Sequence, residues 1–588
     1  MTRRAALLAA ALVLASVGVP IAAATPPTSE PNFAATVLPR PCTPKPGDLQ
    51  EAAWAEREGW AGPEYERYPG KCQRLRFSYG PFTVKPGQND VLVEPIRIEK
   101  PLYDGYMTRF APDLVRAEDG TVPPIEQVHL HHAVWITEPT YGEGTAFTFA
   151  GEEKTSFSLP RGYGLPVKGS DAWLILYMIH SAVPQPIEVF ITYDVDYIPR
   201  ATGDAMGIKP AYPIWMDVRP GFYPVFNVER GFGSGGTCTW PRQECAKLDP
   251  YGKVVGGQGA PPDKPGTDLR LPSRGSSLGR ATNFQGGTLI HVAGHLHPGG
   301  LTNDIDLVRG TQSRRIYTGE ARYWDRTDQT RTGGPPTSWD FSQTVQALPY
   351  WGVRVKPGDV LRSNATYDTT VASVYEAMGI AVAYIAPDRP DGTPTAPGVD
   401  PFAVTVDDGA ECPSGGLLAA TPTLCHRGWM THGHLHENDN YGGPGGTLTA
   451  PRGRAANNVA ITGFTYVPGD LSMAAVTGVP TVKVGSTLTF TNADAAANVY
   501  HTATSCAFPC LGATGTSFPV PDGVTSLGRS LDFDSAQLGF GIPTVSAAKN
   551  AATWSLPVTS GAGYAPGEIV TYFCRIHPFM RGAFEVTS

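Results

Sequence analysis

A group of metal-binding side chains lies near the C-terminal end of the sequence. Cys574, His577 and Met580 follow the apolar segment EIVTYF with the spacing C-x2-H-x2-M, which places a thiolate, an imidazole and a thioether on one loop after an expected strand. His501, in NVYHTATSC, is a fourth candidate ligand from an earlier strand. Two imidazoles and a thiolate with a weak axial thioether suit both oxidation states of copper. The four residues predict a type 1 (blue) copper site; the alternative is a chance grouping of core and surface side chains.

Most of the other histidines also fall into a few groups. In an extended strand, residues i and i+2 face the same side, so H-x-H presents two imidazoles to one metal, whereas an adjacent H-H pair needs a loop or a distorted strand. We expect two separate copper sites, one all-nitrogen and one mixed, with the ligands His131, His132 and His180, and His295, His297 and Met378, respectively. A thioether favours Cu(I), so the mixed site is the better place for dioxygen to meet reduced copper. The alternative is a hydrogen-bonded core cluster without metal.

Two further histidines, His129 and His291, lie beside these groups and are candidate outer-sphere partners or spare ligands. A last set, His432, His434 and His436, alternates in a segment rich in Pro and Gly. In an ideal strand the outer two of these would lie ~13 Å apart, so the three cannot bind one ion without a bend. The segment is either a metal site or a solvated linker, and its position suggests a relay or docking surface.

The elements that must position these side chains are expected to be strands. The sequence has 67 Gly and 56 Pro, and short runs of Val, Ile, Thr and Tyr are separated by turn residues. This composition predicts an all-β protein built from β-sandwiches. The expected organisation is a signal peptide, two sandwiches, a linker and a third sandwich, over residues 1–24, 25–200, 201–389, 390–455 and 456–588.

The N-terminus predicts export. Arg3 and Arg4 precede the apolar stretch 5–23, and small residues at 22–24 offer a cleavage site. We therefore expect a secreted or cell-envelope protein, exported by either the general or the twin-arginine route, with no transmembrane segment in the mature chain. The formal net charge of −8, without a long basic run, argues against nucleic acid as a partner.

The nine cysteines fit an oxidising compartment. Eight of them form four local pairs that are plausible disulfides, namely Cys42 with Cys72, Cys238 with Cys245, Cys412 with Cys425, and Cys506 with Cys510. Cys574 is left over, and metal binding would protect its thiol.

Residues 457–588 resemble the cupredoxin family, especially its short-loop members similar to plastocyanin and amicyanin. The resemblance rests on the four ligands and on the segment VTYFCRIHPFMRGAFEV. It implies a Greek-key β-sandwich that forms a blue-copper domain and carries single electrons.

The upstream order of H-H, H, H-x-H and M resembles the copper type II, ascorbate-dependent monooxygenases, which hydroxylate peptidylglycine or dopamine. Segments such as EQVHLHHAVWI and VAGHLHPGGLTNDI are also similar to the stress up-regulated nodulin family. The first resemblance implies two jelly-roll-type β-sandwiches whose two coppers face a solvent cleft. It also implies an electron-donating copper at the all-nitrogen site and an oxygen-activating copper at the mixed site. The cysteines that flank the hydroxylases' ligands are replaced here by Leu130 and Gly379, and no residue matches their substrate contacts.

The leading hypothesis is a secreted copper oxidoreductase, in which the blue-copper domain passes electrons to a monooxygenase-like dicopper module that acts with dioxygen on an unknown small-molecule or peptide substrate. A redox protein or a small reductant would supply the electrons. The alternative is a non-catalytic extracellular copper-binding or electron-transfer protein, and a third interpretation makes the upstream sites zinc or structural sites.

Overall fold

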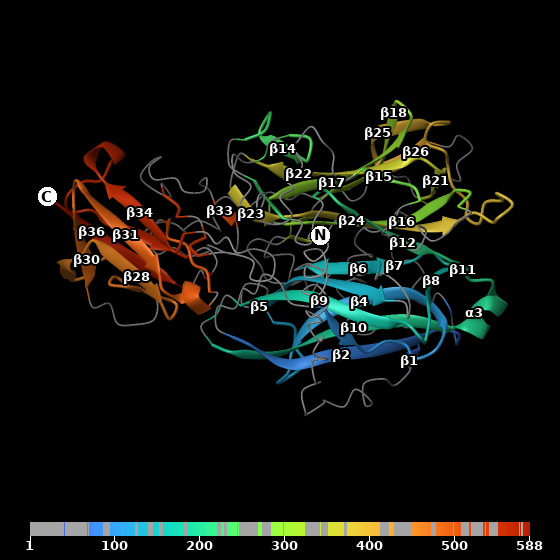
Figure 1. The fold of residues 1–588 in the computed structure, drawn as a ribbon, viewed down its shortest axis with the longest axis horizontal. Coiled ribbons are helices and arrows are strands. Elements are labelled where there is room, and N and C mark those ends of the chain that lie inside the picture. The colour runs from blue at the N-terminus through green and yellow to red at the C-terminus, as the bar shows by residue number, and fades with distance from the viewer. Residues whose placement is uncertain are drawn as a thin grey trace, which may run out of the picture.

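The computed structural model confirms an all-β protein built from several antiparallel sheets (Figure 1). It describes residues 40–41 and most of 68–588; the gaps of five or more residues after residue 67 are 86–94, 139–144, 152–156, 220–224, 246–267, 273–283, 324–340, 343–350, 412–422, 428–447, 472–477, 507–516, 519–532 and 540–550. The one α-helix of the described residues is the short α3 (Arg200–Met206). No helix in this part of the chain has the length and apolar character needed to span a bilayer.

Two sheets form the first sandwich. The strands of one sheet are, in spatial order, β1 (Arg40–Pro41), β2 (Gln73–Val84), β10 (Ile187–Pro199), β4 (Gly105–Arg116), β8 (Tyr163–Val167) and β11 (Lys209–Pro210), with β7 (Phe157–Ser158) beside β4. The strands of the other are β3 (Ile96–Ile98), β9 (Ala172–Ser181), β5 (Val128–Glu138) and β6 (Thr145–Gly151). Their facing sides carry large aromatic rings, such as Phe110 of the first sheet, 5.0 Å from Trp135 of the second. This aromatic packing supplies the apolar burial that holds the two sheets together.

A buried ion pair links β2 to β10. The Arg74 guanidinium donates two hydrogen bonds to the Asp196 carboxylate, at 2.6 and 2.9 Å, and both side chains are less than a tenth exposed. Arg74 and Asp196 are also direct partners in the strand register. The two-pronged pair therefore favours this register over a slipped one.

We expect Asp196→Ala to lower the free energy of unfolding by about 3–5 kcal/mol, because it leaves a buried guanidinium without its counter-charge. The exposed Arg200, which pairs with Asp204 at 3.0 Å, provides a control in the same sandwich. Arg200→Ala should cost less than about 1 kcal/mol. Equilibrium denaturation of the two variants measures both effects, and equal losses would contradict the assigned role of the buried pair.

The second sandwich also consists of two sheets. The inner sheet is formed by β12 (Tyr212–Asp217), β24 (Gly379–Pro387), β16 (Gly287–Leu296) and β21 (Val353–Val355). The outer sheet is formed by β14 (Thr237–Trp240), β22 (Val360–Asp368), β17 (Gly300–Arg309), β18 (Gln312–Glu320), β26 (Thr423–Arg427) and β25 (Thr405–Glu411), with β15 (Asp268–Arg270) beside β22. The strands β25 and β26 come from the segment expected to be a linker, so part of that segment belongs to this sandwich.

The inner sheet of the second sandwich is covered on both faces. In β24 the odd-numbered residues Ala381, Ala383 and Ile385 join the core of their own sandwich, whereas the even-numbered residues of the strand join the core that includes the first sandwich. Successive side chains of a strand point to opposite faces, so the even face of β24 lies against the first sandwich. This double burial explains why β24 reads as a nearly continuous apolar run and why every residue of β16 is buried.

The third sandwich contains the C-terminal strands. One sheet comprises β27 (Arg452–Ala455), β30 (Val479–Lys483), β36 (Arg581–Thr587), β35 (Ile569–Phe573) and β32 (Thr504–Ser505); the other comprises β29 (Thr465–Val467), β28 (Asn458–Thr462), β31 (Ser486–Asn492) and β34 (Thr553–Val558). Tyr572 joins the two sheets, because its ring lies 4.8 Å from Tyr466 and 5.1 Å from Phe490.

Strand pairing connects the third sandwich to the second. β33 (Ser517–Phe518), from the third sandwich's part of the sequence, pairs with β23 (Ser373–Ala377), which in turn pairs with β13 (Phe226–Val228). β23 ends one residue before Met378. Figure 1 shows the third sandwich at the end of the other two, on the side of β5 and β23.

The structure confirms one of the four expected disulfides. Cys238 and Cys245 form a disulfide. Cys72 and Cys506 are also disulfide-bonded, and their expected partners, Cys42 and Cys510, lie outside the described residues, as does Cys412. Among the described cysteines, Cys574 alone is free.

Candidate metal centre

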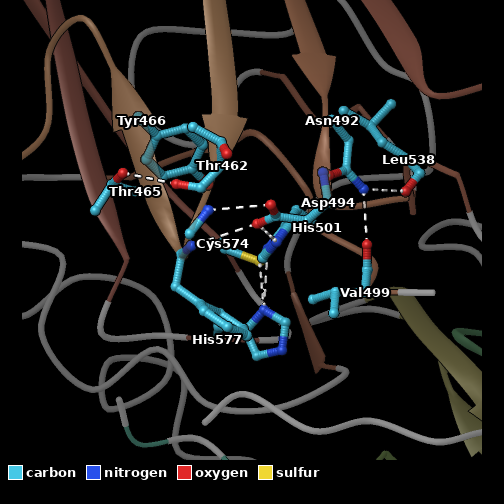
Figure 2. Close-up of polar contacts among 12 residues, drawn as sticks. Thr462, Thr465, Tyr466, Asn492, Asp494, Val499, His501, Leu538, Cys574 and His577 are labelled. Atoms are coloured by element: carbon cyan, nitrogen blue, oxygen red, sulfur yellow. Dashed lines mark hydrogen bonds and ion pairs between the residues drawn. The ribbon is translucent and has the colours of Figure 1, made fainter. Parts of the chain in front are cut away.

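Three of the four predicted type 1 ligands converge in the third sandwich. Among the residues that the structure describes, only His501, Cys574 and His577 each place one ligand atom within 4.8 Å of the others. Cys574 directly follows β35, and His577 lies on the loop between β35 and β36. His501 forms a bridge with Leu538 and lies beside this loop (Figure 2). The C-x2-H spacing and the distant histidine therefore meet as the sequence predicts.

The distances suit a trigonal metal site. Cys574 Sγ lies 3.9 Å from His501 Nδ1 and 3.7 Å from His577 Nδ1, and the two Nδ1 atoms lie 3.1 Å apart. A metal ~2.0 Å from each nitrogen and ~2.3 Å from the sulfur, with angles near 120°, would separate sulfur and nitrogen by ~3.7 Å. All three side chains are fully buried. The donor set and its spacing thus fit copper without rearrangement.

Met580 belongs to the same loop. Its N–H donates to the His577 carbonyl at 2.8 Å, and its carbonyl accepts the Cys574 N–H at 3.1 Å. These two bonds close the loop that carries the ligands. The Met580 side chain is fully buried, as an axial thioether would be.

The sulfur of Cys574 is held in an environment that favours the thiolate. Burial raises the pKa of the Cys574 thiol, but its interactions with His501, together with the Thr502 N–H that donates to Sγ at 3.3 Å, outweigh burial and lower the pKa. The thiolate is the form that binds metal. The fold therefore favours the form of the Cys574 sulfur that can bind a metal.

Asp494 orients His501. The Nε2–H of His501 donates to the Asp494 carboxylate at 3.1 Å, which leaves Nδ1 directed at Cys574 (Figure 2). The carboxylate also accepts backbone N–H groups of Gly463 at 3.0 Å and Phe464 at 3.4 Å. Burial lowers the pKa of His501, but its hydrogen bonds with Asp494 and Cys574 raise it above the usual value. Such a carboxylate fixes the tautomer of a ligand histidine.

We expect Asp494→Asn to lower the affinity for copper about 10–100-fold, the usual effect of losing the hydrogen-bonding partner of a ligand histidine. The reduction potential should rise, because a nearby negative charge stabilises Cu(II) more than Cu(I). Competition titration and spectroelectrochemistry measure the two effects. An unchanged affinity and potential would mean that Asp494 does not act through His501.

The upstream histidines of the first sandwich lie on β5 and β9. The register of β5 against β9 shifts between Leu130 and His132, so His131 is the extra residue of a β-bulge. A bulge redirects side chains that would otherwise point to opposite faces. The Nδ1 atoms of His131 and His132 consequently lie 3.4 Å apart. This bulge is the distorted strand that an adjacent H-H pair was expected to need.

The second pair, His295 and His297, lies at the end of β16. His295 is paired with Ile380 of β24, whose side chain belongs to the core facing the first sandwich. Residues opposite each other on neighbouring strands share a face, so His295 points toward the first sandwich. The rings of His295 and His297 lie 5.0 Å apart.

The two predicted sites are adjacent in the structure instead of separated. The ring of His131 lies 4.9 Å from that of His297, across the contact between the two sandwiches. The side chains involved are buried, with exposed fractions of 7 % or less. We call these residues the histidine group: His129, His131, His132, His180, His295 and His297. The solvent cleft implied by the monooxygenase resemblance is therefore not seen at this point.

Met378 is tied to His297 through Tyr367. The Tyr367 hydroxyl accepts the His297 N–H at 2.9 Å and donates to the Met378 carbonyl at 2.6 Å. Tyr367 itself is fully buried on β22. It thus fixes the backbone of both predicted ligands relative to each other, a role that nothing in the sequence pattern signalled.

His129 and His291 have different surroundings. The His129 ring lies 4.9 Å from that of His180 and 6.3 Å from that of His131, so His129 adjoins the predicted ligands. His291 lies instead beside the rings of Phe157, at 6.1 Å, and Tyr384, at 5.8 Å. The three alternating histidines of the expected linker, His432, His434 and His436, lie outside the described residues.

Three members of the histidine group disfavour protonation, namely His131, His132 and His297. Burial lowers the pKa of His132 to about 3, with a further contribution from His295. Burial likewise holds the pKa values of His131 and His297 well below the usual range, and the charged groups that add to the effect are all histidines. Neutral imidazoles are the form that ligates metal.

One contact joins the two parts of the candidate centre. The ring of His180, at the end of β9, lies 6.1 Å from the ring of His577. His577 belongs to the type 1 arrangement and His180 to the histidine group. The third sandwich therefore docks with its metal ligand facing the histidines of the first.

No known family model matches the chain, and no curated protein matches it at a significant level. Among solved structures, the STIV MCP matches with 9 % sequence identity and a TM-score of 0.22. The match covers 53 % of this chain and 96 % of the STIV MCP chain. The structure of Sulfolobus Turreted Icosahedral Virus matches with a TM-score of 0.14 and 9 % identity, and the match covers 53 % of this chain and 59 % of that chain. Vicilin from Solanum lycopersicum matches with a TM-score of 0.11 and 6 % identity, and the match covers 54 % of this chain and 76 % of that chain. These TM-scores are too low to support an argument.

The fold and the site together define an all-β protein with a buried His–Cys–His–Met arrangement typical of type 1 copper. The donor set is consistent with one such copper, held by His501, Cys574, His577 and Met580.

Proposed function

We propose that the protein is a secreted copper-dependent oxidoreductase. In this proposal the third sandwich is a cupredoxin domain, in which His501, Cys574, His577 and Met580 would hold a type 1 copper that supplies single electrons. The histidine group would hold the copper that uses these electrons with dioxygen on a small-molecule or peptide substrate. Copper supplies the one-electron chemistry, because imidazole and sulfur ligands stabilise both of its oxidation states.

The observation that carries this proposal is the 6.1 Å contact between the rings of His577 and His180. His577 is fully buried, so its imidazole faces protein and not solvent. From His180, the ring of His129 at 4.9 Å leads on to His131. A carrier that exchanged electrons only with outside partners would gain nothing from covering its ligand with histidines of another sandwich.

The residues of the chain have distinct tasks in this scheme. Asp494 holds His501 in the tautomer that presents Nδ1 to the metal. Tyr367 keeps the backbone of His297 and Met378 in place. Burial keeps His131, His132 and His297 neutral and excludes water, which strengthens electrostatic effects at the site.

The test is reoxidation of the blue copper by air. In protein purified without chelator, metal analysis and paramagnetic resonance should find blue and non-blue copper, and reduced blue copper should recover its colour when dioxygen is admitted. In the double variant His295→Ala/His297→Ala, the blue spectrum should remain but recovery in air should slow at least about tenfold. Equal recovery in both proteins would favour a simple electron carrier. Zinc in place of non-blue copper would favour a structural role for the upstream histidines.

A further inference from the structure

We propose that His131, His132, His295 and His297 hold one shared copper centre, in which two copper ions lie close together across the contact between the two sandwiches. This inference rests on the proposed function, since it presumes that the histidine group binds copper. It replaces two isolated mononuclear sites by a single coupled one.

The distances within the group support a shared centre. The Nδ1 atoms of His131 and His132 lie 3.4 Å apart, close to the ~3–3.5 Å expected for two nitrogens bound to one metal at ~2 Å each. The ring of His297 lies 4.9 Å from the ring of His131 in the other sandwich. It lies equally near, at 5.0 Å, to the ring of His295, two residues earlier in its own sandwich. No boundary between an all-nitrogen and a mixed site can be drawn through rings so evenly spaced.

His297 points to a ligand role by itself. Its side chain is fully buried, and neither of its ring nitrogens has a hydrogen-bond partner among the described residues. A buried polar group without a partner costs roughly 1–3 kcal/mol. Binding of a metal by one of these nitrogens would compensate for this cost.

The two sandwiches are fixed together beside the group. The Tyr384 hydroxyl of β24 donates to the Phe147 carbonyl of β6 at 2.6 Å, and Phe149 packs against Trp215 at 5.8 Å and against His295 at 5.6 Å. These contacts belong to a continuous apolar core that includes both sandwiches. Because the sheets are packed together here, copper bound by β5 and copper bound by β16 would be near neighbours.

Among the described residues, the histidine group does not form a three-ligand site in advance. Within the described part of the chain, the type 1 residues alone bring three ligand atoms within 4.8 Å of one another. The histidine group offers instead a close pair of nitrogens from the first sandwich, His131 and His132, and the neighbouring rings of His295 and His297 from the second. Pairs of this kind suit two metals held side by side, at the separation of roughly 3.5–4 Å common in two-metal sites.

The experiment uses the full-length protein loaded with copper and oxidised. We expect one blue copper and two non-blue coppers, with X-ray absorption showing a copper–copper distance on the order of 4 Å. Magnetic coupling should make the non-blue signal in paramagnetic resonance smaller than the copper content requires. Neither measurement depends on a variant that must fold.

Single variants in each sandwich provide the second arm. If the centre is shared, His131→Gln and His297→Gln should each abolish the copper–copper distance and release the magnetic coupling. If the sites are separate, each variant should remove one copper and leave the other copper's signal unchanged. His291→Gln is the matched control and should change neither, because His291 lies on β16 with His295 but packs against Phe157 and Tyr384. The blue absorption reports correct folding in every sample.

The outcomes separate this inference from the proposed function. Two non-blue coppers with full, independent signals and no copper–copper distance would overturn the shared centre and leave the proposed function standing. Protein that binds blue copper alone would overturn both.

Discussion

Replacement of Cys574 by serine will abolish the intense visible absorption of the copper-loaded protein. This absorption requires a thiolate bound to Cu(II), and Cys574 is the one free cysteine among the residues that the structure describes. Serine is similar in size and its oxygen can still accept the Thr502 N–H, so the fully buried site should keep its packing. Absorption spectra of wild type and variant at equal copper content measure the effect.

The same variant should no longer transfer electrons through the type 1 site to dioxygen, because a hydroxyl is a poor ligand for Cu(I). Non-blue copper at the histidine group should be unaffected. Met580→Leu is the matched control in the same loop: it removes only the weak axial ligand, so the colour should persist while the reduction potential rises. A Cys574→Ser protein that stayed blue would exclude this residue as the ligand.

The second large effect concerns the contact between the type 1 arrangement and the histidine group. His180→Phe should leave the blue absorption unchanged, since His180 is not part of the type 1 arrangement, but slow the reoxidation of blue copper by dioxygen about 10–100-fold. Phenylalanine keeps a ring between His577 and His129 and removes the nitrogens that can bind metal or hydrogen-bond. Rapid mixing of reduced protein with dioxygen measures the rate.

Copper analysis of the His180 variant distinguishes two roles. Loss of a non-blue copper would identify His180 as a ligand, whereas full copper content with slow reoxidation would identify it as the connecting residue. His291→Gln, which alters a buried histidine away from this route, should reoxidise at the wild-type rate. A wild-type rate in the His180 variant would refute the proposed path through this contact.

Much of the type 1 arrangement could be predicted because its pattern is local. The spacing C-x2-H-x2-M places three donors on one loop, and backbone hydrogen bonds between Cys574, His577 and Met580 close that loop. Local sequence also predicted that His131 and His132 need a distorted strand, and the structure contains a β-bulge there. The contact of Asp494 with His501 could not be predicted, because a carboxylate seven residues before a histidine is not a recognisable pattern.

Other features could not be predicted, because they depend on how separate sheets pack. Tyr367 lies on β22 of the outer sheet and hydrogen-bonds to the backbone of His297 and Met378 beside the inner sheet. Its role becomes visible only from the relative positions of the two sheets. The expected linker illustrates the same limit: its Pro- and Gly-rich composition masks two strands, β25 and β26, that are completed by pairing with β18.

By itself, then, the sequence determined the all-β class, the candidate type 1 ligands and the loop that carries Cys574, since strand periodicity and ligand chemistry act over a few residues. Tertiary structure alone decided that His131 meets His297 and that His180 meets His577. These pairs are separated by more than a hundred residues, and what brings them together is the burial of apolar faces between sandwiches, which has no signature in the spacing of the histidines.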